Sequence, residues 1–255
     1  MRLRQVALVS GKLAEVAQQF EDVFGLNVAY NDPHIQHYGL KNAVLPAGAS
    51  FIEIVEPIRE DASAARHLKR RGGDAGYMII LQVADAPKEQ ARAEALGVRV
   101  VDKIDRPDYY CAHFHPADFG GMLVSFDQQR SEADFLEADG DWMPAGPDWR
   151  GAQSKRVQDI AAVTLSTSDP AALARRWSEL TDCPLDKKDP LRLQLDHGEI
   201  RFVQGEPGGP TLISRLDLAV DDVDAVWNAA ESAKLDVSSD GILIGGIRFH
   251  PIHPD

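Results

Sequence analysis

Hydrophobic residues recur along the chain with two spacings, one typical of strands and the other typical of helices. Residues 3–9 alternate between two faces and predict a strand, whereas residues 12–24 carry apolar side chains at helical spacing up to Gly25. Residues 32–39 are expected to form a loop. Three further strands are predicted at residues 27–30, 42–46 and 51–55. The first stretch of the chain therefore has the predicted order β-α-β-β-β.

The same order of elements returns in the remainder of the chain. A short basic helix is predicted at residues 63–71, and the next long helix begins at Pro87 and ends at Gly97. Later helices are predicted after Asp169 and after the pair Asp221 and Asp222, which are placed to cap them. The other strands are predicted at residues 77–83, 98–101, 109–114, 122–126, 160–166, 191–195, 199–203, 212–220, 242–244 and 247–249. The repeat predicts an α+β fold built from four tandem βαβββ modules.

Residues 128–156 interrupt this repeat. The stretch is polar and acidic, and it contains Trp142 and Trp149, which we expect to pack on a protein surface rather than to stack on a ligand. We therefore predict two domains, at residues 1–127 and 157–255, joined by a linker at residues 128–156.

Composition narrows the class of partner. The chain has 255 residues, of which 26% are charged, and its net charge of −13 disfavours nucleic acid or an anionic membrane as a partner. Its two cysteines, Cys111 and Cys183, lie far apart, which favours a reduced cytoplasmic protein. We expect no membrane span and no signal peptide. A small molecule is the expected ligand, and the sequence leaves a homodimer open.

Glu53 lies in the middle of the strand predicted at residues 51–55, between apolar neighbours. A carboxylate in such a place is costly unless it has a partner. A metal ion, a cation or a substrate proton could be that partner, so the surroundings of Glu53 are the first place to look for chemistry.

Four segments carry a family resemblance: residues 3–9, 51–57, 72–83 and 115–125. In their order they resemble the vicinal oxygen chelate superfamily, the group of glyoxalases, bleomycin-resistance proteins and extradiol dioxygenases. The similarity covers residues 1–127 well and is fainter over residues 157–255. It implies that the modules pair into two bowl-shaped domains, and that many members hold a divalent metal in the bowl.

The resemblance places metal-ligand positions at Gln5 and Glu53. Amide and carboxylate oxygens suit a divalent ion such as Zn, Ni, Mn, Fe or Mg. The corresponding positions of the second module are Met78 and Ser125, which are poor ligands, so the ligand set is incomplete. The other interpretation is a pocket without metal, in which Gln5 and Glu53 hydrogen-bond one another or Glu53 pairs with an arginine.

In the third and fourth modules the same positions carry Arg201 and Arg215, together with Ala162 and His250. Arginines cannot bind a metal but can hold an anion, such as part of a substrate. The competing interpretation is that they form internal ion pairs with acidic neighbours.

Histidine and tyrosine side chains complete the candidates. His113 and His115 share one face of a predicted strand with Tyr109, so we consider both histidines for proton transfer, and Tyr109 for substrate contact. A structural role for His115 remains open. Tyr77 and, in the expected loop, His37 are further candidates for substrate contact.

The first functional expectation is a glyoxalase-like small-molecule enzyme, of the isomerase, lyase or dioxygenase kind. Glu53 would be its base or a metal-bound carboxylate, with Gln5 as the second ligand. The alternative is a protein without metal that binds or sequesters a small molecule, as the bleomycin-resistance branch implies.

Overall fold

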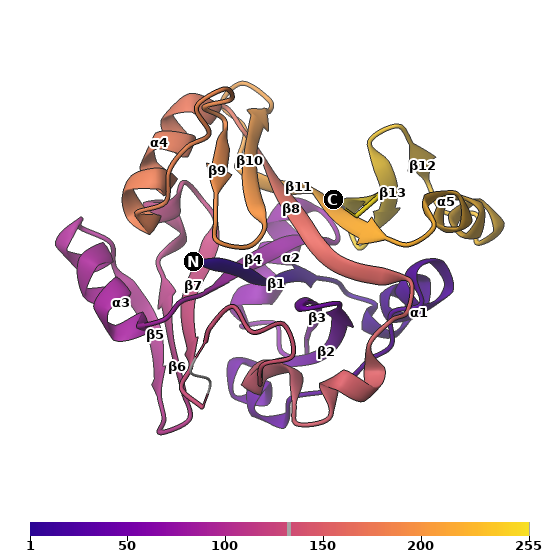
Figure 1. Cartoon of the computed structure of the whole chain (residues 1–255), viewed down its shortest axis with the longest axis horizontal. Coiled ribbons are helices and arrows are strands. Elements are labelled where there is room, and N and C mark those ends of the chain that lie inside the picture. The colour runs from indigo at the N-terminus through magenta and orange to yellow at the C-terminus, as the bar shows by residue number, and fades with distance from the viewer. Residues whose placement is uncertain (132–133, 255) are drawn as a thin grey trace. The chain divides into compact units, whose positions relative to one another are not determined.

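The computed structural model describes residues 1–131 and 134–254. The first repeat consists of β1 (Arg2–Val9), α1 (Leu13–Phe24), the 3₁₀ helix η1 (Pro33–Tyr38), β2 (Leu40–Ala47), β3 (Ser50–Pro57) and α2 (Ser63–Arg71). The second consists of β4 (Ala75–Gln82), α3 (Ala86–Ala95), β5 (Val100–Asp105), β6 (Tyr109–Phe114), η2 (Pro116–Phe119) and β7 (Leu123–Gln129). Figure 1 shows these elements along the chain.

The second half of the chain repeats this plan, with long first strands, β8 and β11, and short strands β9, β12 and β13. After η3 (Met143–Ala145) and η4 (Trp149–Ala152), the third repeat has β8 (Val157–Thr167), α4 (Pro170–Thr181), β9 (Arg192–Gln194) and β10 (Glu199–Gln204). The fourth has β11 (Leu212–Val220), α5 (Val223–Ser232), β12 (Val237–Ser238), β13 (Gly241–Ile244) and β14 (Ile247–Ile252). The repeated order confirms the predicted α+β fold of tandem modules.

The strands form two mixed seven-stranded sheets, one from each half of the chain. Their orders are β2-β3-β1-β4-β7-β6-β5 and β12-β13-β14-β11-β8-β10-β9. In the first sheet β1 and β3 are parallel, whereas β2 and β3 form an antiparallel hairpin. This pairing places residues from β1, β2 and β3 side by side on one face.

Some elements differ from the sequence prediction. The strand predicted at residues 27–30 is reduced to an isolated bridge between Tyr30 and Val44. The expected loop at residues 32–39 contains η1, which begins where the Asp32 side chain accepts a hydrogen bond from the backbone N–H of His34. The edge strand β5 spans Val100–Asp105 instead of the predicted residues 98–101. Its charged side chains interrupt the alternation of apolar and polar residues by which a strand is recognised.

The chain forms two compact units. Unit 1 comprises Met1–Arg4, Met78–Met143 and Ala162–Ile213, and unit 2 comprises Gln5–Tyr77, Pro144–Ala161 and Ser214–Asp255. The domain boundaries predicted from the sequence follow the repeat and stay a prediction. Among the described residues, no helix is both long and apolar enough to cross a membrane.

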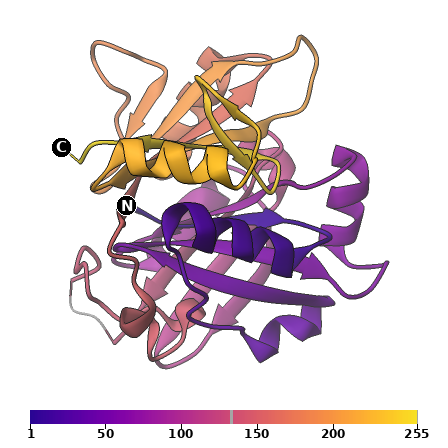
Figure 2. The ribbon, with the colours of Figure 1, turned by 90° about the vertical axis from the view of Figure 1, so that its right-hand side faces the viewer.

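Each unit has an aromatic core. In unit 2, α1 and α5 pack side by side (Figure 2), and the ring of Phe20 on α1 lies edge-on against Phe249 on β14, with centroids 4.9 Å apart. In unit 1, Trp177 on α4 packs against Phe119, with ring centroids 5.4 Å apart, and donates its indole N–H to the Phe119 carbonyl. Such rings contribute much of the buried apolar area of a core.

Candidate functional site

Glu53 occupies the middle of β3 in unit 2. Its Cα is paired with Ala7 on the parallel strand β1 and with Val44 on the antiparallel strand β2. Strands on both sides bury the carboxylate, and only 8% of the residue is exposed. The alternation of β3 puts Phe51, Glu53 and Val55 on the same face of the sheet.

Two amide side chains hold this carboxylate. Gln5 donates from Nε2 to Glu53 Oε2 at 2.9 Å, and Asn42 donates from Nδ2 to Glu53 Oε1 at 2.7 Å. The Asn42 amide is itself oriented, because its Oδ1 accepts the backbone N–H of Asp32 at 2.8 Å. Each carboxylate oxygen of Glu53 therefore accepts a hydrogen bond from a neutral donor.

Sequence reasoning missed Asn42. The signal that could have found it is the short turn at residues 48–49, which pairs β2 with β3 so that Asn42 and Val44 share the face of Glu53. Asn42 is 5% exposed, and an amide buried that deeply in a strand needs partners of its own.

Burial raises the pKa of Glu53 above its usual range. The hydrogen bonds from Asn42 and Gln5 lower the pKa, whereas the negative charge of Asp32 raises it, and burial outweighs the amides. Within residues 1–131 and 134–254, no lysine or arginine forms an ion pair with Glu53. A carboxylate without a cationic partner and with a raised pKa is a stronger base than an ordinary glutamate, which suits it to accept a proton.

Tyr77 is the second polar residue close to this site. Its ring packs against the buried cluster that includes Val9 and Val55, which follow the positions of Ala7 and Glu53 on the same face. Burial raises the pKa of Tyr77, and the charge of Glu53 raises it further. The phenol therefore stays protonated at neutral pH and can donate a hydrogen bond. Its role in substrate binding stays a prediction.

The residues present do not fit the divalent metal that the family resemblance implies. The amide N–H groups of Gln5 and Asn42 face the carboxylate oxygens of Glu53, whereas a metal shell there would require their oxygens. In unit 1, Met78 offers a thioether, and Ser125 donates its hydroxyl to Asp127. No group of three or more His, Cys, Asp and Glu in the described part of the chain is arranged to hold a metal.

The second module carries a different polar cluster, entirely within unit 1. Asp127 on β7 accepts hydrogen bonds from Tyr109 and from Ser125. Its Cα is paired with Gln82 on β4 and with Cys111 on β6. The buried Oε1 of Gln82 has no hydrogen-bond partner among the residues that the structure describes. Tyr109, predicted to contact substrate, is thus engaged with Asp127.

The two candidate histidines lie in unit 1. His113 Nδ1 is 3.8 Å from Asp102 Oδ2; burial lowers the pKa of His113, and Asp102 raises it. His115 caps η2, since its Nδ1 accepts the backbone N–H of Ala117 at 3.2 Å. Glu53 belongs to unit 2, so a role of either histidine in proton transfer with Glu53 stays a prediction.

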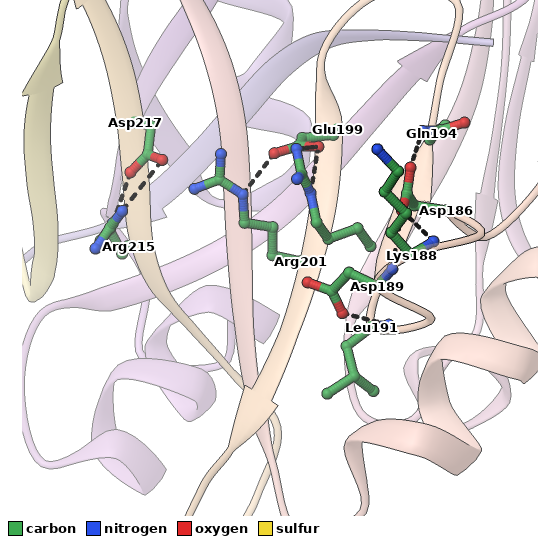
Figure 3. Close-up of polar contacts among 10 residues, drawn as sticks. Asp186, Lys188, Asp189, Leu191, Gln194, Glu199, Arg201, Arg215 and Asp217 are labelled. Carbon is green, nitrogen blue, oxygen red and sulfur yellow. Dashed lines mark hydrogen bonds and ion pairs between the residues drawn. The ribbon is translucent and has the colours of Figure 1, made fainter.

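The other residues predicted to contact substrate are His37, Arg201 and Arg215. His37 is exposed on η1, with its ring 5.4 Å from that of Tyr38. Arg201 donates from Nε to Glu199 Oε1 at 2.5 Å on β10, and Arg215 donates from Nε to Asp217 Oδ1 at 2.6 Å on β11 (Figure 3). Both arginines thus form ion pairs with acidic neighbours two residues away. A role in substrate binding stays a prediction for all three.

The fold and the site together define an α+β protein of repeated βαβββ modules with a buried carboxylate on one sheet. The glyoxalase-like domain family matches residues 6–181, more than half of the chain, and the protein belongs to this family. The match ends at the last residue of α4.

Solved structures with similar folds each cover about half of the chain. Methylmalonyl-CoA epimerase from Mycobacterium tuberculosis has a TM-score of 0.46 and 22% identity, and the match covers 50% of this chain and 87% of that one. The Streptomyces coelicolor epimerase in complex with 2-nitronate-propionyl-CoA has a TM-score of 0.46 and 22% identity, covering 51% and 97%. A hypothetical protein from Bacillus halodurans has a TM-score of 0.45 and 21% identity, covering 52% and 97%. None of the curated proteins matches this chain.

Proposed function

We propose that the protein is a glyoxalase-like small-molecule enzyme in which Glu53 moves a proton at a carbon next to a carbonyl group. The observation that carries this proposal is the state of Glu53: a buried carboxylate that accepts hydrogen bonds from two neutral amides, with a raised pKa. A structural carboxylate at this depth would normally be stabilised by a cation.

The surrounding residues have matching tasks. Gln5 and Asn42 hold the two oxygens of Glu53, so the carboxylate has a fixed orientation when it removes a proton. The neutral phenol of Tyr77 is suited to donate a hydrogen bond to the oxygen of a substrate, where negative charge develops. These roles suit isomerase or lyase chemistry. We derive no oxygenation step, because the residues at the metal positions do not fit a metal.

The proposal is tested by following solvent exchange at carbon. The protein is incubated in D₂O with a panel of 2-oxo acids, malonate-type diacids and thioesters, and the loss of the proton next to the carbonyl is followed by ¹H NMR. We expect the wild-type protein to exchange at least one compound and Glu53→Gln to lower that rate by about 10²- to 10⁴-fold. Glu60→Gln is the matched control, because Glu60 is an exposed carboxylate shortly after β3. Exchange that survives Glu53→Gln unchanged would refute the role of Glu53.

A second candidate function is sequestration of a small molecule without turnover. The observation that favours it is Ser125, which is fully buried and bonds Asp127, so the second module adds no reactive group at its metal position. The amide in Glu53→Gln imitates a protonated carboxyl group. A compound that binds wild-type protein and Glu53→Gln equally, and is exchanged by neither, would favour sequestration.

A further inference from the structure

Helix α2 concentrates positive charge in a protein of net charge −13. Four of its nine residues are cationic, namely Arg66, Lys69, Arg70 and Arg71. Arg66, Lys69 and Arg70 are exposed. A local cationic surface on an acidic protein attracts anions to that place in particular.

The position of α2 is fixed against the Glu53 sheet. Its Ala64 and Leu68 pack into the same cluster as Val55 of β3, and the helix contacts β3 directly. On the same side, the ring of His67 lies edge-on to Tyr77 with centroids 5.3 Å apart, and its Nε2 is 3.0 Å from the Gly76 carbonyl oxygen. The cationic residues of α2 are therefore held next to Tyr77 and close to the strand of Glu53.

Arg66 and Arg70 are separated by one helical turn and lie on the same side of α2. Burial and the charge of Glu53 raise the pKa of Tyr77, whereas Arg66 and Arg70 lower it. This agrees with the packing of α2 and Tyr77 on the same cluster beside β3. Lys69 lies one residue before Arg70 and is rotated about 100° away from it.

The positive charge of Arg70 is not neutralised. Arg66 donates to Ser63 Oγ at 2.9 Å, which fixes its guanidinium, whereas Arg70 forms no ion pair within the described ranges. Burial lowers the pKa of Arg71, and the charge of Arg70 lowers it further. Burial also lowers the pKa of His67, to which the charges of Arg71 and, less strongly, Arg70 contribute.

We propose that Arg66 and Arg70 bind an anionic group of the substrate, a carboxylate or a phosphate, while the reacting carbon of that substrate lies at Glu53. The substrate is therefore a small acidic oxo compound, and Tyr77, which packs with α2 beside β3, is available to contact it. This inference rests on the proposed function for the position of the reacting carbon, and its anion site can be measured without turnover.

The test is a calorimetric titration of the full-length protein with malonate and, separately, with inorganic phosphate. We expect the double variant Arg66→Gln/Arg70→Gln to weaken the affinity of the bound anion by about tenfold or more, the effect of losing one charge-assisted hydrogen bond. Lys69→Gln removes one charge from the same helix and should change the affinity by less than about twofold. Binding of malonate alone assigns a carboxylate, binding of phosphate alone assigns a phosphate, and binding of both assigns their shared charge.

Three results would overturn the inference: no binding of either anion, equal weakening by Lys69→Gln, or unchanged affinity in the double variant. Circular dichroism of each variant verifies that α2 is folded. Glu53→Gln separates the two proposals, since it should bind the anion at least as well as wild-type protein but should not exchange protons. An anion site that depends on Arg66 and Arg70 in a protein without exchange activity would leave this site standing and reject the proposed function.

Discussion

The first two modules each contain a buried carboxylate on one face of their strands, but they surround it differently. Glu53 accepts from two amides, Gln5 and Asn42, whereas Asp127 accepts from two hydroxyls, Tyr109 and Ser125. In each module the last strand pairs with the first. Glu53 on β3 lies opposite Ala7 of β1, and the equivalent residue on β7 is Ser125, which lies opposite Ile80 of β4. Asp127 is thus two residues further along its strand than Glu53 is along β3.

The two carboxylates also differ in exposure and in the donors that surround them. Asp127 is 1% exposed and Tyr109 2%, whereas Glu53 is 8% exposed and its neighbour Tyr77 is half-buried. Hydroxyl donors satisfy Asp127 within its own module. Glu53 has a raised pKa, and the basic helix α2 contacts its strand β3. If Glu53 acts as proposed, equivalent modules of one fold differ in reactivity because one carboxylate is displaced along its strand.

The largest effect is expected from the tryptophan that covers the second module. Trp142 is 1% exposed, and its ring lies edge-on to Tyr109 with centroids 5.9 Å apart. Trp142→Ala should lower the free energy of unfolding by about 3–5 kcal/mol, because it leaves a cavity beside Tyr109 and Asp127. Urea denaturation measures this, with Leu136→Ala as the control, since Leu136 is 40% exposed in the same segment. Equal effects of the two variants would mean that Trp142 does not close the module.

Replacing Asp127 and Glu53 by their amides should change the free energy of unfolding by different amounts. Asp127→Asn replaces one acceptor oxygen by a donor that faces a hydroxyl, and it should lower the free energy of unfolding by about 1.5–3 kcal/mol. Glu53→Gln removes a buried charge and should stay within about 1 kcal/mol of wild type at neutral pH.

The pH dependence sharpens this second prediction. The folded-state pKa of Glu53 lies above its ordinary value of 4.5, so the folded protein binds more protons than the unfolded chain between these two values. The wild-type protein should therefore lose stability relative to Glu53→Gln as the pH rises above 4.5, by at most about 1.4 kcal/mol per pH unit. Thermal denaturation across this range measures the slope. A difference that grows toward acid pH would contradict the assignment of Glu53.

The fold was predictable because its elements carry strong local signals. Asp169 and Asp222 cap α4 and α5 as expected, and Gly25 ends α1 in the left-handed conformation, with φ 63°. The prediction of a strand at residues 27–30 was wrong, because a short apolar run does not determine how many backbone hydrogen bonds form, and only the bridge at Tyr30 is present.

The site was predictable only in part. Glu53 came from its place in a predicted strand and Gln5 from the family resemblance, and the structure shows the hydrogen bond that had been the interpretation without metal. Asn42 and Asp127 were missed because their roles depend on strand register. The short turn between β2 and β3 indicates that register for Asn42, whereas no such local signal marks Asp127. The roles of Tyr77 and of the α2 arginines depend on how a helix packs against the sheet, which periodicity alone does not reveal.

Asn42 offers a finer test of how the Glu53 pKa is set. Asn42→Ala removes a hydrogen bond that lowers this pKa, so the pKa should rise further. Proton exchange by Glu53 requires the ionised form, and the rising limb of the pH–rate profile should move to higher pH. On this limb the exchange rate at a given pH should fall about tenfold for each pH unit by which the limb moves. Asn31→Ala is the control, since among the described residues the Asn31 side chain bonds only the backbone carbonyl of Asn42. A profile that moves equally in both variants would assign the effect to the loop.

The smallest effect is expected for the contributions of His67 and His113 to stability at acid pH. Burial lowers the pKa of His67 to about 4, and the cations Arg71 and Arg70 lower it as well. The unfolded chain then binds more protons than the folded protein between pH 6.5 and about 4, so stability falls as the pH is lowered through this window. Burial also lowers the pKa of His113, but Asp102 favours its protonated form.

His67→Gln, which keeps a donor for the Gly76 carbonyl, should therefore flatten the acid side of the stability curve more than His113→Gln does. Chemical denaturation at several pH values measures both slopes, and the reverse order would show that Asp102 does not offset the burial of His113.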